Sequence, residues 1–189
     1  MHVVGTIAWG HFDCYFIMNA DQKKDSNMEC TVVSRTLDLV NNKLASKAHA
    51  MPRSLIINPD NTTREAKNQH FFTYMSYLKA TGKMDATQVE FAEPGHTHNE
   101  QDRNFAGIAR CLSKAPILEN PEEFEGWMKE HVRPQPGHEL HVEILTETRD
   151  FQSWCILGYG GRGRQGKEEF YPGMGVCLAS PCQLAGMCQ

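Results

Sequence analysis

The sequence predicts an α/β layer fold, in which helices cover a sheet that contains parallel strands. Short apolar runs at residues 54–58 and 87–92 are bounded by turn residues, as buried strands are. Segments with apolar residues at helical spacing precede and follow these runs, and this alternation is typical of parallel pairing. Two β-rich runs before residue 20 predict an antiparallel hairpin at the edge of the sheet.

The first fifty residues predict this hairpin and one long helix. The strands are expected at residues 3–9 and 14–18, joined by a turn. We expect Asp13 in this turn, and Asp21 in the polar break that follows, to be solvated. Three consecutive residues are good N-caps for the helix: Asp25, Ser26 and Asn27. Its apolar residues recur at steps of four, three and four: Val33, Leu37, Val40 and Leu44.

The middle of the chain alternates strand and helix. The strand at 54–58 is followed by Thr62 and Glu65, whose spacing matches a capping box and predicts a helix that runs to Gly82. The strand at 87–92 comes next. Because both strands are followed by helices, we expect them to be parallel neighbours in one sheet.

The later elements are predicted by caps and periodicity. A second capping spacing, Thr97 to Glu100, predicts a helix with Phe105, Ile108, Ala109 and Leu112 on one face. Asn120 and Pro121 fit the N-cap and first position of another helix. A strand is expected at 140–144. Two aromatic residues beyond it are expected to pack back on the body: Phe151 and Trp154.

Composition limits the class of protein. The chain has 189 residues, 40% of them hydrophobic and 22% charged, which suits one globular domain with a core of its own. A formal charge of −4 does not fit a dedicated nucleic-acid clamp but leaves room for local basic patches. No apolar run suits a membrane span or a signal peptide. Seven cysteines without framework spacing indicate a reducing compartment. We therefore expect an intracellular protein, nuclear or cytoplasmic and not secreted.

Residues 158–189 are predicted to be a glycine-rich, poorly ordered tail, because eight of the 15 glycines lie between Gly158 and Gly186. The basic run at 162–167 resembles an RGG-type single-strand binder, but its few charges favour a flexible linker. Three cysteines in the tail are spaced by five and six residues with no nearby histidine, which argues against a zinc site: Cys177, Cys182 and Cys188.

Candidate chemistry gathers where the two middle strands end. Asp60 follows the first strand, and His96, His98 and Asp102 follow the second. The carboxyl ends of parallel strands share one sheet edge, and carboxylates gathered there suit Mg²⁺ or Mn²⁺. Structural roles compete with this interpretation. Taken alone, Asp60 is better explained by an Asx turn, Glu100 by a capping box, and Asp102 by a favourable place in the helix dipole. The histidines can also hydrogen-bond the turn.

One short motif points to a different enzyme. Gly95-His96-Thr97-His98 resembles the last metal-binding signature of calcineurin-type metallophosphoesterases. That family also needs an Asp-x-His element near its first strand and a Gly-Asn-His-Asp/Glu element in mid-chain, and the sequence contains neither. We therefore reject this assignment.

Two longer elements together resemble an uncharacterised family of transposon-derived proteins. The first is Asp-Asn-x-x-x-Glu-x-Lys-Asn, found at residues 60–68. The second is Gly-His-Thr-His-x-x-x-Asp-x-x-Phe, found at 95–105. The resemblance covers residues 2–155. It extends to three smaller features: the opening strand with Gly5 and Gly10, the turn at 24–27, and Phe151-x-x-Trp154.

The family is similar to transposase and integrase catalytic domains of the ribonuclease H-like class. The resemblance implies a ribonuclease H-like mixed sheet flanked by helices and Mg²⁺- or Mn²⁺-dependent cleavage or strand transfer on DNA. Asp60 and Asp102 would be the catalytic acids and metal ligands. His96 and His98 would position substrate, and Lys67, Arg64 and Arg103 would contact phosphate. It implies no membrane partner and no small-molecule cofactor.

The sequence departs from this pattern. The first carboxylate of the fold lies on a central first strand, which the resemblance places before residue 2. We therefore expect the domain at 2–155 to be truncated at its N-terminal end, with an incomplete or inactive metal site. The family also has acids at the positions of Asn99 and Glu100, and only Glu100 keeps one. The alternatives are a non-catalytic nucleic-acid or protein interaction module on the same scaffold, and a relic reading frame without selected function.

Overall fold

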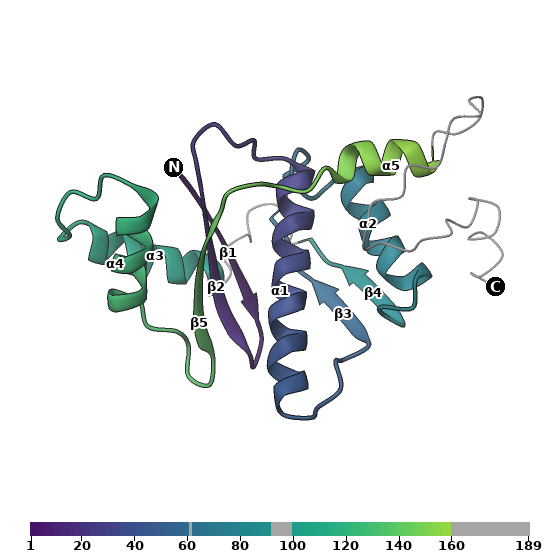
Figure 1. Ribbon diagram of the computed structural model, residues 1–189, viewed down its shortest axis with the longest axis horizontal. Coiled ribbons are helices and arrows are strands. Elements are labelled where there is room, and N and C mark those ends of the chain that lie inside the picture. Colours follow the sequence, from purple (N-terminus) through teal and green to yellow (C-terminus); the bar gives the residue numbers. More distant parts are fainter. Residues whose placement is uncertain (61, 92–99, 160–189) are drawn as a thin grey trace.

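The computed structural model describes residues 1–60, 62–91 and 100–159, which form a mixed α/β structure with two small sheets (Figure 1). The three-stranded sheet has the order β1 (His2–Ala8), β2 (Phe12–Met18), β5 (Glu139–Leu145). In it β1 runs antiparallel and β5 parallel to β2. The two-stranded sheet pairs β3 (Ser54–Ile57) in parallel with β4 (Ala86–Val89). The predicted α/β class and the parallel pairing of the two middle strands are confirmed.

Within the described residues, five helices cover these sheets: α1 (Ser26–Ser46), α2 (Gln69–Ala80), α3 (Glu100–Leu112), α4 (Pro121–His131) and α5 (Phe151–Tyr159). In Figure 1, α1 crosses in front of the sheets, α3 and α4 lie beyond the three-stranded sheet, and α2 and α5 lie beside the two-stranded sheet. Helices therefore cover both faces of the three-stranded sheet.

Strand β2 is the centre of the larger sheet, and every one of its seven residues is buried. Alternate side chains of a strand point to opposite faces. Cys14 and Phe16 therefore pack with Met28 and Val32 of α1. On the other face the strand packs against α3 and α4, with Tyr15 and Ile17 meeting Ile108, Trp127 and Met128. Burial on both faces explains why residues 14–18 of this strand are a continuous apolar run rather than an alternating one.

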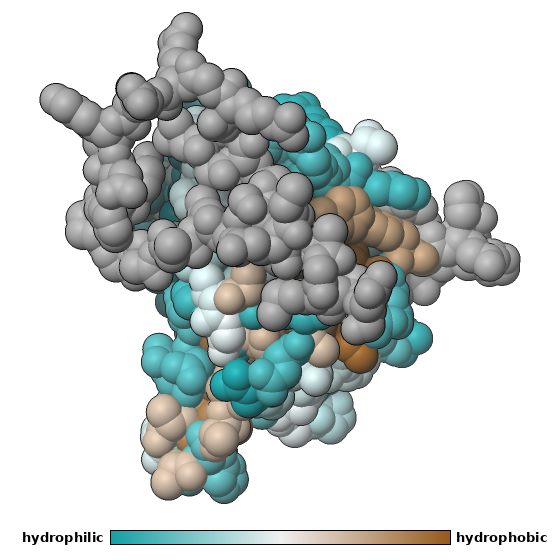
Figure 2. Space-filling model, turned by 90° about the vertical axis from the view of Figure 1, so that its right-hand side faces the viewer, coloured by the Kyte–Doolittle hydropathy of each residue, from teal (hydrophilic) through white to brown (hydrophobic). Residues whose placement is uncertain are grey.

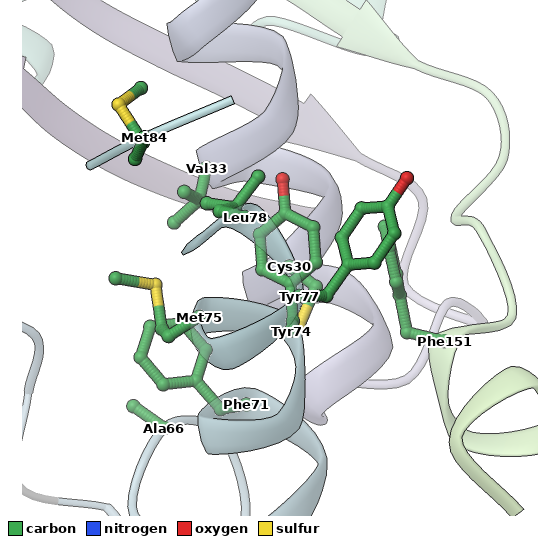
Figure 3. Packing of buried hydrophobic residues seen from close by; sticks show 10 residues of the cluster. All are labelled: Cys30, Val33, Ala66, Phe71, Tyr74, Met75, Tyr77, Leu78, Met84 and Phe151. Carbon is green, nitrogen blue, oxygen red and sulfur yellow. The ribbon is translucent and has the colours of Figure 1, made fainter. Parts of the chain in front are cut away.

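Helix α1 joins the two sheets. A second stripe of its side chains, Cys30 and Val33, packs with Phe71 and Leu78 of α2 and with Leu55 and Ile57 of β3. Figure 3 shows the side chains of α1 and α2 in this cluster pointing toward one another, with Phe151 beside Tyr74. The rings of Phe151 and Tyr74 lie 4.8 Å apart, so the predicted return of the Phe151 segment to the body is confirmed. The helix over this segment, α5, was not predicted.

Local signals identified several helix starts correctly. The side chain of Asp25 accepts hydrogen bonds from the backbone N–H groups of Asn27 and Met28, which selects one of the three candidate caps of α1. Asn120 caps α4 by accepting from the backbone N–H of Glu123 at 2.8 Å. The capping spacing that begins at Thr97 lies outside the described residues.

The predicted start of α2 is wrong. The helix begins at Gln69, and its N-cap is Asn68, which accepts from the N–H groups of His70 and Phe71 at 3.0 and 3.1 Å. The Asn68 amide also donates to backbone carbonyls in the preceding turn, those of Thr63, Arg64 and Glu65. This side chain therefore stabilises a turn over residues that the capping-box spacing had assigned to the helix. The hairpin is also not wholly at a sheet edge, because β5 pairs with β2.

The expectation that Asp13 is solvated is wrong, because this residue lies within β2 and is only 2% exposed. One carboxylate oxygen lies 2.7 Å from His138 Nδ1, and the other accepts from the backbone N–H of Gln135 at 2.7 Å. His138 Nε2 accepts from the backbone N–H of Gly10 at 2.9 Å. Since Nε2 is an acceptor, Nδ1 carries the proton and donates it to Asp13. The predicted tail at 158–189 falls outside the described residues from residue 160 onward.

We predict that Asp13→Asn lowers the free energy of unfolding by about 3 kcal/mol, because its NH2 group must face one of two donors, the N–H of Gln135 or that of His138. Urea unfolding followed by circular dichroism measures this loss. The matched control is Asp21→Asn, at an exposed loop position, which should change stability by less than about 0.5 kcal/mol. Equal stabilities for the two variants would contradict a structural role for the buried pair.

Candidate functional site

The carboxyl ends of β3 and β4 lie at the same edge of the two-stranded sheet. The register pairs Ile57 with Val89, and the N–H of Glu90 donates to the carbonyl of Ile57 at 2.9 Å. Asp60 follows β3 at this edge and is exposed. The segment after β4 leads from the same edge, as predicted, but His96 and His98 lie outside the described residues.

Near this edge, Glu29 lies within electrostatic range of two other acids. Burial raises the pKa of Glu29, in the first turn of α1, to about 7, and the neighbouring carboxylates of Glu65 and Asp60 raise it further in that order of effect. The Glu29 side chain is partly buried, whereas Asp60 is exposed. We call Glu29, Asp60 and Glu65 the carboxylate cluster.

The turn between β3 and α2 holds Glu65 in place. Backbone N–H groups of Ala66 and Lys67 donate to the carbonyl of Thr62 at 3.1 and 2.9 Å, and Ala66 is only 1% exposed within the core shared by α1 and α2. The predicted phosphate contacts, Arg64 and Lys67, are both exposed on this turn. The Lys67 ammonium lies 5.3 Å from the centre of the Phe91 ring, a cation–π contact that directs it toward the end of β4.

Asp102 lies in a different setting, exposed in the first turn of α3. This helix packs against β1: a Cβ atom on Gly5 would lie 1.8 Å from the Gln101 amide nitrogen, so a larger residue there would displace the Gln101 side chain. Arg103, also expected to bind phosphate, forms an ion pair with Glu100 at 2.9 Å. The two predicted acids therefore belong to different parts of the fold. Asp60 follows β3, whereas Asp102 lies on α3, which packs against β1.

The carboxylate cluster fits a hard divalent cation in its chemistry, since carboxylate oxygens are the ligands that Mg²⁺ and Mn²⁺ prefer. Burial is the main cause of the raised pKa of Glu29, and a cation would offset the smaller contribution from repulsion by Glu65 and Asp60. In residues 1–60, 62–91 and 100–159, however, no group of three or more His, Cys, Asp or Glu side chains is arranged so that it could hold a metal ion. The donors match, but the described side chains do not form a complete ligand set.

Glu29 was missed by the sequence analysis. An acid in the first turn of a helix is sufficiently explained by the helix dipole, so nothing local sets Glu29 apart. Its neighbours Asp60 and Glu65 lie more than thirty residues along the chain. Only the packing of α1 over the end of β3 brings the three acids together.

The fold and the cluster define a mixed α/β domain with acidic groups at the carboxyl edge of a parallel strand pair. Residues 1–159 match the family described as Domain of unknown function (DUF7869), and the chain belongs to this family. The comparisons with curated proteins and with solved structures gave no match. In the described part of the chain, no helix has both the length and the apolar character needed to cross a membrane.

We predict that Glu29 makes stability depend on pH. Its folded-state pKa of about 7 lies above the ordinary value of 4.5, so the folded chain keeps a proton that the unfolded chain loses between these pH values. The free energy of unfolding should therefore fall as pH rises from 4.5 to 7. Glu29→Gln should be more stable than the parent at pH 7 by about 2 kcal/mol, a value reduced for partial solvent access, and equally stable below pH 4.5.

Urea unfolding in EDTA across this pH range measures the difference. Glu122→Gln, which removes an exposed acid from the first turn of α4, is the matched control and should keep the pH dependence of the parent. An unchanged pH dependence in Glu29→Gln would mean that the carboxylate cluster does not form.

Proposed function

We propose that this domain is a transposase- or integrase-like domain of mobile-element origin. Its ancestral activity is Mg²⁺- or Mn²⁺-dependent cleavage or strand transfer at a DNA phosphodiester, and in this chain the metal site is incomplete or inactive. The observation that carries the proposal is the place of Asp60 at the carboxyl edge of a parallel strand pair, within electrostatic range of Glu29, as Glu65 is. Acids at this edge of an α/β sheet suit divalent-cation chemistry on phosphate.

The order of elements supports a ribonuclease H-like origin. The chain runs through an antiparallel hairpin, then α1, β3, α2, β4 and α3. In Figure 1 the strands follow one another in the order β5, β2, β1, β3, β4, with α1 packed on both sheets. Neither the free edge of β1 nor that of β3 pairs with another described strand. One extended strand between them would join the two sheets, and that is where the ribonuclease H-like fold has its central strand.

In this proposal Asp60 and Asp102 are the acids that bind the cation, and Glu29 adds a carboxylate beside Asp60. The cation would supply charge neutralisation and water activation at the phosphate. Arg64 and Lys67 lie exposed on the turn next to Asp60, where they are placed to contact the DNA backbone.

Isothermal titration of Mn²⁺ into the chain tests this assignment. We predict binding in the micromolar range that Asp60→Ala and Asp102→Ala each abolish, because each removes a ligand of the same cation. Asp21→Ala, an exposed loop acid, is the control and should bind as the parent does. No binding by the parent, or parent-like binding by either variant, would overturn the metal assignment.

A second candidate is a non-catalytic interaction module on the same scaffold. It is favoured by apolar surface around the two-stranded sheet: Ile56 of β3 is 60% exposed and Phe72 of α2 is 41% exposed. Figure 2 faces the side of the molecule that carries these elements and shows hydrophobic residues at the surface among hydrophilic ones. Absence of Mn²⁺ binding to the chain would favour this second candidate over the metal-dependent one.

A further inference from the structure

The tip of the β1–β2 hairpin, residues 8–12, presents an exposed tryptophan. The N–H of His11 donates to the carbonyl of Ala8 at 2.8 Å and closes the turn, and Gly10 adopts a φ of 75° that favours glycine. Trp9 stands beside this glycine and is 64% exposed. Large aromatic side chains are usually well buried, so an indole held outside the core indicates a contact surface.

The indole has a rigid support. Its ring packs edge-to-face with that of His138, with centroids 5.9 Å apart and planes at 79°. His138 is itself fixed by Asp13 on one side and by the Gly10 N–H on the other. An edge-to-face contact uses at most one face of the indole, so at least one face is left for another flat ring.

Cations and acids both adjoin the tip. The ammonium of Lys43 and the backbone N–H of Glu139 each donate to the carbonyl of His11 at 2.9 Å. Asp13 binds His138 from within the sheet. Burial lowers the pKa of His11, and the neighbouring basic groups, which include Lys43 and Lys47, lower it further, so Lys47 lies within electrostatic range of the tip.

These cations are not all neutralised. Lys43 forms an ion pair with Glu139 at 3.1 Å, so Glu139 largely neutralises the charge of this lysine. Lys47, one turn further along at the end of α1, is exposed, as is His49. A negatively charged group bound at the tip therefore has the exposed Lys47 within electrostatic range, through its effect on His11 beside Trp9.

We propose that the hairpin tip binds single-stranded DNA, with a base stacked on Trp9 and the backbone phosphates near Lys47. A free aromatic face beside positive charge is the combination that single-strand binders use, since every base has a π-face and every nucleotide a phosphate. The inference extends the DNA partner of the proposed function. It does not depend on the metal site, because Glu29 and Lys43 are 14 residues apart on α1, about 21 Å along the helix.

The experiment is a titration of fluorescently labelled oligothymidylate with the full chain in EDTA, followed by anisotropy, so that the result is independent of any metal. Trp9→Ala should weaken binding about tenfold or more, the effect of losing one stacked base. Lys47→Glu should also weaken binding, and should reduce the slope of log affinity against log salt by about one or more.

The controls are matched changes elsewhere on the surface. Ile117→Ala removes an apolar side chain that is 88% exposed between α3 and α4, and Lys79→Glu reverses an exposed charge at the end of α2; both should bind as the parent does. Urea unfolding should show that Trp9→Ala is folded.

Two outcomes would overturn the proposal. One is equal affinity of the parent and Trp9→Ala for oligothymidylate. The other is competition by polyglutamate as strong as that by the oligonucleotide, which would indicate an acidic protein partner in place of DNA. Failure of Mn²⁺ binding would leave this result untouched, so the two proposals fail separately.

Discussion

The packing of α1 against both sheets is the constraint on which the rest of the structure depends. The helix uses two adjacent stripes, Met28 and Val32 toward β2 and Cys30 and Val33 toward β3 and α2. A parallel pair of four-residue strands is not stable alone, so β3 and β4 rely on the apolar surface that α1 and α2 provide. The same helix sets the position of both candidate sites, since Glu29 lies in its first turn and Lys43 in its last.

The charges on α1 follow its dipole, with an acid at the N-terminal end and cations at the C-terminal end. For Glu29 this favourable field is not sufficient. The dipole contributes about 0.3–1 kcal/mol at an exposed helix end. A rise of the pKa from 4.5 to about 7 corresponds to roughly 3 kcal/mol in the opposite direction. Burial, reinforced by the carboxylates of Glu65 and Asp60, therefore outweighs the dipole, so the packing of α1 rather than its dipole decides the protonation of Glu29.

The sequence predicted the features that depend on neighbours along the chain. Helix α1, helix α4 and the parallel strands β3 and β4 follow from periodicity and caps within short windows. The start of α2 was misplaced because two local signals compete, the Thr62 spacing and the Asn68 cap, and only the turn in the structure decides between them. Asp13 and Glu29 were misjudged or missed for a different reason. Their environments depend on residues far away in the sequence. Asp13 is surrounded by Gln135 and His138, and Glu29 is influenced by Asp60 and Glu65.

The buried pair of Asp13 and His138 is better understood as a specificity element than as a source of stability. A buried carboxylate bound to a neutral imidazole gains little over well-packed apolar residues, but it accepts only the arrangement in which every donor and acceptor is matched. Here Asp13 binds the turn that leads into β5, which fixes the parallel register of β2 with β5. His138 in turn accepts a hydrogen bond from the Gly10 N–H and packs against the ring of Trp9, so its position orients both residues. One carboxylate inside the sheet therefore sets both the strand register and the orientation of the indole at the surface, so the exposed tryptophan is part of the ordered structure rather than an accident of the turn.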